Sequence, residues 1–242
     1  MSISPRIVSW YVHGRQPKGR RLSVLVLTLL SLLLPGMAAG SEAGRPITGD
    51  AKMAFFQAWS ERLQAMRSLR MVFTQEKSLR FLRRPLVAQG ALWLKDETLL
   101  YVLKNAAGET ELEVRLDPHT AKAHYPLIQT LEVMNLHTAQ ASPFSVPFLT
   151  RDPAALEKDY EIELWAASDL HTLKLIPRDP QALVAEIRLT LKDFQPQQFV
   201  QVEKTGNQLI MHISTFIVNP NIDEAQLELH VPAGTKVTRP LP

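Results

Sequence analysis

Most of the chain after residue 69 alternates between apolar and polar residues with a period of two. The clearest segments are 109–116, 186–192 and 226–231, in which Leu, Val and Ile recur at alternate positions. Such alternation is typical of antiparallel strands that have one face in water and one in an apolar interior. The pattern predicts further strands at 70–77, 86–95, 98–104, 121–125, 160–165, 171–176, 198–204 and 208–217.

Clusters of Gly, Pro, Asn and Asp separate these segments, for example at 105–108, 177–180 and 205–207. Residues of this kind favour tight turns between neighbouring strands. The strands do not alternate with long helices, so a parallel sheet is not expected. We therefore predict a mainly β fold, an incomplete antiparallel β-barrel made of one curled sheet.

One amphipathic helix is expected before the strands. Asp50 can cap its first turn, and apolar residues then recur at spacings of three and four. This spacing predicts one buried helix face. The residues on that face are Met53, Phe56, Trp59, Leu63 and Met66.

The segment 134–158 interrupts the strand pattern with Pro143, Pro147 and Pro153 in an apolar stretch. Residues 153–158 are predicted to form a short helix with proline in its first turn. Two interpretations remain open for this segment. It is either a lid over the open side of the curled sheet or an ordinary loop packed on the core.

The first forty residues have the pattern of a secretory signal. The apolar run 22–34 follows Lys18, Arg20 and Arg21, and small residues follow at 38–41. The run is shorter than the roughly 20 residues that a membrane-spanning helix needs, although an uncleaved anchor is the alternative. We predict a signal peptide at 1–40, cleaved near residue 40, a flexible leader at 41–49, and one domain at 50–242.

The predicted signal peptide changes how the net charge of the chain is interpreted. The whole chain has 27 Lys and Arg against 24 Asp and Glu, but five of the basic residues and no acidic ones lie in 1–40. The remainder has a net charge of −2, which argues against nucleic-acid binding. The densest basic segment left is 62–84, either a solvated surface or a contact for anionic lipid or an acidic partner. Cysteine is absent, which excludes disulfides, thiol nucleophiles and Cys-ligated metals.

No segment predicts an active site, a metal or a cofactor. The acidic trios at 109, 111, 113 and at 159, 161, 163 each share a strand face, which favours a solvated surface over a cation site. His119 and His124 lack a completing ligand set, and Asp117 begins a turn. The Gly-x-Ser-x-Gly nucleophile motif and glycine-rich phosphate loops are also missing. We therefore predict a protein that is not an enzyme.

From Met66 onward the order of motifs resembles the LolA family, periplasmic carriers of outer-membrane lipoproteins. Segment 69–77 is similar to its first strand with a Phe-x-Gln element, and 90–95 is similar to its Gly-x-Leu-Trp-Val-Lys strand. Segment 117–125, followed by 143–149 and Tyr160, resembles its turn, strand and proline-bearing helical segment. Its closing strands are matched by 175–177, 205–207, 221–223 and 231–237.

The resemblance implies a half-open barrel in the periplasm, with a helical lid over an apolar cavity that shelters acyl chains. It implies an acylated lipoprotein or another lipid conjugate as cargo, an inner-membrane transporter and an outer-membrane acceptor as partners, and a monomer. Covering acyl chains is worth about 25 cal/mol per Å². The expected cavity residues are Leu92, Leu94, Leu100, Val102, Leu112, Val114, Leu116, Phe144, Phe148, Leu189 and Leu191; a filled core is the alternative for them.

The chain departs from the family at two places. Asp96-Glu97 stand where the family has Arg-Pro, whose arginine holds the lid shut, and Leu100-Tyr101-Val102 replace its Phe-x-Trp. Segment 76–90 looks like a divergent LolA-like branch. That branch implies a glycolipid or aryl-polyene type of conjugate as an alternative cargo. An RseB-like envelope sensor is a further alternative, because RseB has a similar fold.

Overall fold

A single sheet of 13 strands organises the residues that the computed structural model describes, 44–136 and 153–239. The strand order is β1-β8-β9-β10-β11-β12-β2-β3-β4-β5-β6-β7-β13, and only the β7–β13 pair is parallel. The strands are β1 (Arg45–Ile47), β2 (Ser68–Ser78), β3 (Leu86–Lys95), β4 (Thr98–Asn105), β5 (Thr110–Leu116), β6 (Thr120–Tyr125), β7 (Thr130–Asn135), β8 (Tyr160–Ala167), β9 (Leu170–Pro177), β10 (Val184–Lys192), β11 (Gln195–Glu203), β12 (Gln208–Val218) and β13 (Lys236–Thr238).

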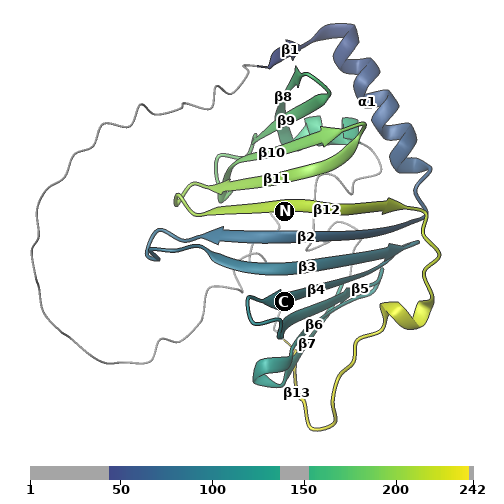
Figure 1. The fold of residues 1–242 in the computed structure, drawn as a ribbon, viewed down its shortest axis with the longest axis vertical. Helices are drawn as coiled ribbons and strands as arrows, with labels where there is room; N and C mark the ends of the chain where they lie inside the picture. Colours follow the sequence, from purple (N-terminus) through teal and green to yellow (C-terminus); the bar gives the residue numbers. More distant parts are fainter. Residues whose placement is uncertain (1–43, 137–152, 240–242) are drawn as a thin grey trace, which may run out of the picture. The chain divides into compact units, whose positions relative to one another are not determined.

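The sheet curls but does not close, because β1 and β13 remain at its two edges (Figure 1). The prediction of a mainly β, incomplete antiparallel barrel with an N-terminal helix is confirmed. Within the segment 153–158, a 3₁₀ turn at Pro153–Ala155 leads into the short helix α2 (Leu156–Asp159). The apolar stretch before it and the predicted signal peptide lie outside the described residues.

The predicted strands agree with the structure except at 226–231. There, Glu224–Leu227 forms a 3₁₀ turn, η5, whose first residues are capped by the Asp223 side chain. The Asp223 N–H donates a hydrogen bond to the Gln226 side-chain oxygen at 3.0 Å, so the capping box is complete. The alternation at 226–231 wrongly predicted a strand. Leu227 and Leu229 do pack on the sheet, but the backbone of this segment pairs with no strand.

Two short strands, β1 and β7, have no counterpart in the sequence analysis, and β13 is met there only through the resemblance of 231–237 to the closing strands of the LolA family. Strand β1 falls inside the segment expected to be a flexible leader, and its backbone pairs with β8 from Arg45 to Ile47. Three-residue strands such as β1 and β13 are too short for alternation to reveal. Their pairing depends on an edge that only the folded sheet supplies.

Helix α1 (Gly49–Gln64) begins one residue before the predicted cap and buries a different set of residues at its start. Met53 is 64% exposed, whereas Phe55 is buried. The remaining predicted face is confirmed, because Phe56, Trp59 and Leu63 are buried. Full burial of each large apolar side chain is worth about 1.5–3 kcal/mol. This face therefore holds α1 against the sheet.

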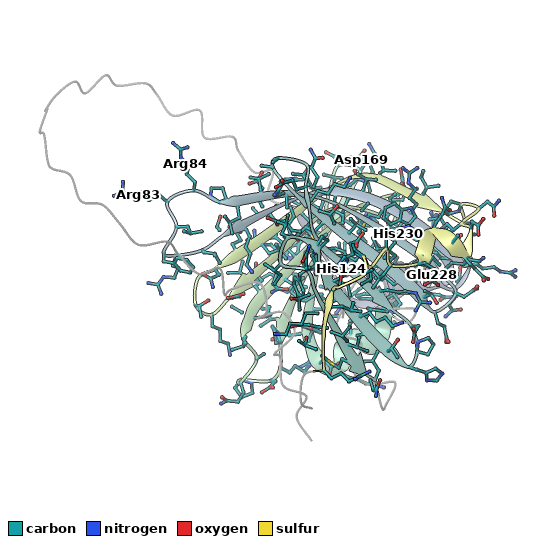
Figure 2. All side chains as sticks on the ribbon, turned by 90° about the horizontal axis from the view of Figure 1, so that it is seen from below. Arg83, Arg84, His124, Asp169, Glu228 and His230 are labelled. Atoms are coloured by element: carbon teal, nitrogen blue, oxygen red, sulfur yellow. The ribbon has the colours of Figure 1, made fainter. Side chains whose placement is uncertain are left out.

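The C-terminal segment, residues 219–239, crosses the outer side of β4 and β5 (Figure 2). Ile222 and Leu227 pack with Leu100 in a buried cluster, and Val102 lies at its edge. The Arg115 guanidinium also reaches the Glu228 carboxylate at 3.5 Å. The outer face of this part of the sheet is consequently not a solvated surface.

Candidate functional site

The inner face of the sheet, defined as the face that carries Leu92, is almost continuously apolar. Leu92 is paired with Met71 on β2 and with Tyr101 on β4. Tyr101 is in turn paired with Val114 on β5. Directly paired residues share a face, so side chains from four consecutive strands meet on one surface. All four of these side chains are buried.

The register brings seven of the predicted cavity residues to this inner face. On β10, Leu189 is paired with Phe199, which is paired with Met211, and Met211 is paired with Gln75 beside the Leu92 row. Leu189 is fully buried, whereas Leu94 and Leu112 are partly exposed. The seven residues are Leu92, Leu94, Leu112, Val114, Leu116, Leu189 and Leu191.

Two predicted residues lie on the other face. Leu100 is paired with Trp93, and Val102 is paired with Ala91, so both point away from Leu92. Every residue of 99–103 is apolar, so the alternation by itself cannot assign these two residues to a face. The C-terminal segment covers them instead. Phe144 and Phe148 lie outside the described residues.

A pocket of about 610 Å³ lies between α1 and the β1, β8 and β9 strands. The helix contributes Ala51, Ala54 and Ala58, whose small side chains share one helix face; Ala51 and Ala54 are exposed, so the pocket is open to solvent along this side of α1. Arg45 is exposed and lines the pocket on the β1 side. The remaining lining residues are Pro46, Ile47, Thr48, Phe55, Ala166, His171 and Phe194.

One wall of the pocket is a group of stacked rings. Phe55 lies 5.1 Å from Phe194 and 4.9 Å from His171, measured between ring centres. The Arg62 guanidinium lies 4.4 Å from the centre of the Phe194 ring, on the ring face. Phe194 and Asp193 both have positive φ, 64° and 48°, as a two-residue turn between β10 and β11 requires. Packing therefore holds Phe194 in a backbone conformation that bulky residues rarely adopt.

Sequence reasoning missed this wall. Phe55, His171 and Phe194 come from three elements that are distant in sequence, and no single segment pairs them. The one local signal is the spacing of Ala51, Ala54 and Ala58, which predicts one helix face with small side chains that leave space next to it.

Some polar side chains lie on the inner face, and Tyr101 and Tyr125 each form a hydrogen bond there. Tyr101 donates a hydrogen bond to the Gln75 side-chain oxygen at 3.2 Å, and burial raises the pKa of its hydroxyl. On β7, burial raises the pKa of the Glu132 carboxyl, although a hydrogen bond from Tyr125 opposes the rise. Burial and the Glu132 charge raise the pKa of Tyr125 to about 12.

Three of the other candidate residues make contacts that stabilise the fold. Glu113 lies 2.9 Å from the Nδ1 of buried His124, Glu163 forms an ion pair with Lys174, and Asp117 stabilises a turn. Among the described residues, no group of three His, Asp or Glu side chains is placed to hold a metal ion. No helix in the same ranges is both long and apolar enough to cross a membrane.

Comparison with known proteins points to one family. The family model described as outer membrane lipoprotein carrier protein LolA matches residues 127–229. An outer-membrane lipoprotein carrier protein from Chromohalobacter salexigens is 22% identical over 207 residues, which cover 84% of this chain and 95% of that protein.

Solved structures with some likeness include an uncharacterized conserved protein from Thermus thermophilus, with a TM-score of 0.47 and 16% identity over 78% of this chain and 99% of that one. A LolA superfamily protein from Nitrosomonas europaea has a TM-score of 0.37 and 10% identity, covering 72% of this chain and 97% of that one. From the family model and the carrier relative, together with the curled sheet, we conclude that this chain is a divergent LolA-like protein.

Proposed function

We propose that this protein is a periplasmic carrier that shelters the acyl chains of a lipoprotein or another lipid conjugate on its way to the outer membrane. It performs no chemical reaction. Its work is to remove apolar chains from water, at about 25 cal/mol for each Å² covered. The family to which its relatives belong supports this role.

The observation that carries the proposal is the pocket beneath α1. Its volume of about 610 Å³ lies within the usual range for ligand pockets, and most of its lining is Ala, Ile, Pro and Phe. An acyl chain needs such a lining and no specific hydrogen bonds. The neighbouring inner face extends the apolar surface from β8 to β5, and the partly exposed Leu94 and Leu112 lie on it.

The test is mass spectrometry of organic extracts from the protein purified under native conditions, combined with titration of the fluorescent fatty acid cis-parinaric acid. The wild type should carry acylated lipid and bind the probe. The variant Ala54→Phe places a ring in the pocket and should lose most of both. Gln57→Phe introduces the same side chain at an exposed position of α1 and should retain both.

The extracted lipid distinguishes the cargoes. An acylated peptide supports a lipoprotein carrier, and a glycolipid or an aryl-polyene ester supports a carrier of another conjugate. A wild-type protein that is empty and does not bind the probe would contradict the carrier. If that empty protein also bound a periplasmic protein domain tightly, an RseB-like sensor would replace the carrier.

A further inference from the structure

The hairpin between β2 and β3 ends in a loop that exposes apolar side chains. We call residues 79–87 the β2–β3 tip. Phe81 is 68% exposed, and Leu86 and Val87 are 44% and 45% exposed. A single exposed apolar residue is ordinary on a protein surface, but three at one hairpin end, Phe81 in the loop and Leu86 and Val87 at the start of β3, are typical of a contact surface.

The same tip is strongly basic. Arg80, Arg83 and Arg84 lie within it and Lys77 lies two residues before it, whereas residues 77–87 contain no Asp or Glu. Figure 2 shows Arg83 and Arg84 at the outer end of the hairpin, pointing away from the sheet. Both are exposed, and neither pairs with an acidic side chain of the described residues.

The base of the tip is held in place by the neighbouring hairpin. The Arg80 guanidinium donates a hydrogen bond to the Thr205 carbonyl oxygen, and the Arg80 backbone N–H donates one to the Asn207 side-chain oxygen, both at 3.2 Å. Leu79 is buried, and its carbonyl accepts a hydrogen bond from Leu82 N–H at 2.9 Å. Arg80 thus stabilises the loop. Phe81, Arg83 and Arg84 are exposed on this fixed loop, so they can contact a partner without first becoming ordered.

The acidic group on the adjacent hairpin is hydrogen-bonded within that hairpin. On the adjacent hairpin, the Glu203 carboxylate accepts hydrogen bonds from the Thr205 hydroxyl at 2.9 Å and from the Asn207 side-chain amide at 2.8 Å. Its charge also acts on Lys77. Arg83 and Arg84 therefore present their charges outward.

We propose that the β2–β3 tip docks on the surface of an anionic phospholipid bilayer. Phe81 and Leu86 enter the region between headgroups and acyl chains, while Arg83 and Arg84 contact the lipid phosphates. Phe and Leu side chains gain by burial at the boundary between headgroups and acyl chains, and each arginine near an anionic membrane strengthens binding. The proposal rests on the tip alone and stands whether or not the pocket carries lipid.

The test uses the absence of cysteine from the chain, which allows one label at one chosen position. Pro85→Cys carries the dye NBD at the tip, and Glu97→Cys carries it in the exposed turn at the opposite end of β3. Vesicles contain phosphatidylglycerol and phosphatidylethanolamine, or phosphatidylcholine only. NBD emission should rise at residue 85 with anionic vesicles, and should not rise at residue 97.

Substitutions at the tip test its chemistry. Arg83→Gln with Arg84→Gln should weaken binding to anionic vesicles by roughly five-fold per arginine, and Phe81→Ser should weaken it by about ten-fold. High salt should reduce the arginine contribution more than that of Phe81. Because residue 85 reports only on the tip, unchanged emission there overturns the proposal even if another segment binds vesicles. An equal rise with phosphatidylcholine also overturns it.

Discussion

Phe73 lies directly across the β2–β3 pair from Gly90, and its ring occupies the space that a side chain at residue 90 would need. The same ring stacks on Tyr101, with 5.7 Å between the ring centres. Glycine within a strand normally weakens it, but here it allows a large ring to lie flat on the sheet. The two residues thus act as one packing unit on the inner face.

Replacing Gly90→Ala should lower the free energy of unfolding by about 1–3 kcal/mol, because the new Cβ overlaps the Phe73 ring. Urea denaturation measures the change. In a Phe73→Leu background the same substitution should cost markedly less, because the smaller side chain leaves room. An equal cost in both backgrounds would mean that the ring is not responsible.

Phe194 is predicted to stabilise the protein by its contacts and to destabilise it by its backbone. Phe194→Ala removes the stacking with Phe55 and Arg62 and should cost about 1–3 kcal/mol of stability. Phe194→Gly loses the same contacts but relieves the positive φ, so it should be more stable than Phe194→Ala by about 1 kcal/mol. Thermal unfolding of the two variants makes the comparison, and a less stable glycine variant would contradict the assigned strain.

Asp117 should contribute stability that depends on pH. Burial opposes its ionised form, but hydrogen bonds from the Thr120 hydroxyl, the His119 and Thr120 N–H groups and Arg115 outweigh burial and lower its pKa to about 2. The stabilisation is complete above the unfolded pKa of roughly 3.9 and disappears as the pH falls through about 2. Asp117→Asn should therefore cost about 1–2 kcal/mol at pH 7. Urea denaturation at several pH values should show the difference shrinking below pH 4.

The charge of Glu132 has the opposite effect on stability to that of Asp117. Burial raises the pKa of its carboxyl, so the folded state binds the proton more tightly than the unfolded chain does. The charge reduces stability above the raised pKa, and Glu132→Gln should raise the melting temperature at pH 7. The gain should fall as the pH drops through this pKa toward the unfolded value. Calorimetry across that range checks it, and a gain independent of pH would point to packing rather than charge.

The local pattern predicted both the strands and their faces where one face of the strand is charged and the other is apolar. In β5 and β10, acids and basic residues alternate with Leu, Val and Ile, and the structure places those apolar residues on the inner face. In β4 it predicted the strand but could not assign its faces, because Leu99 to Leu103 are all apolar. There both faces are covered, one by the inner packing and the other by the C-terminal segment.

The sequence by itself determined the period of most strands, the apolar face of α1 from Phe56 onward and the class of the fold, because hydrophobic burial imposes a repeat of 2 or 3.6 on any amphipathic element. Only the tertiary structure decided that Leu100 lies under Leu227, that Phe55, His171 and Phe194 form a pocket wall, and that Phe81 stays exposed. These relationships join residues far apart in the chain, and such contacts depend on the register and curl of the whole sheet rather than on any local repeat.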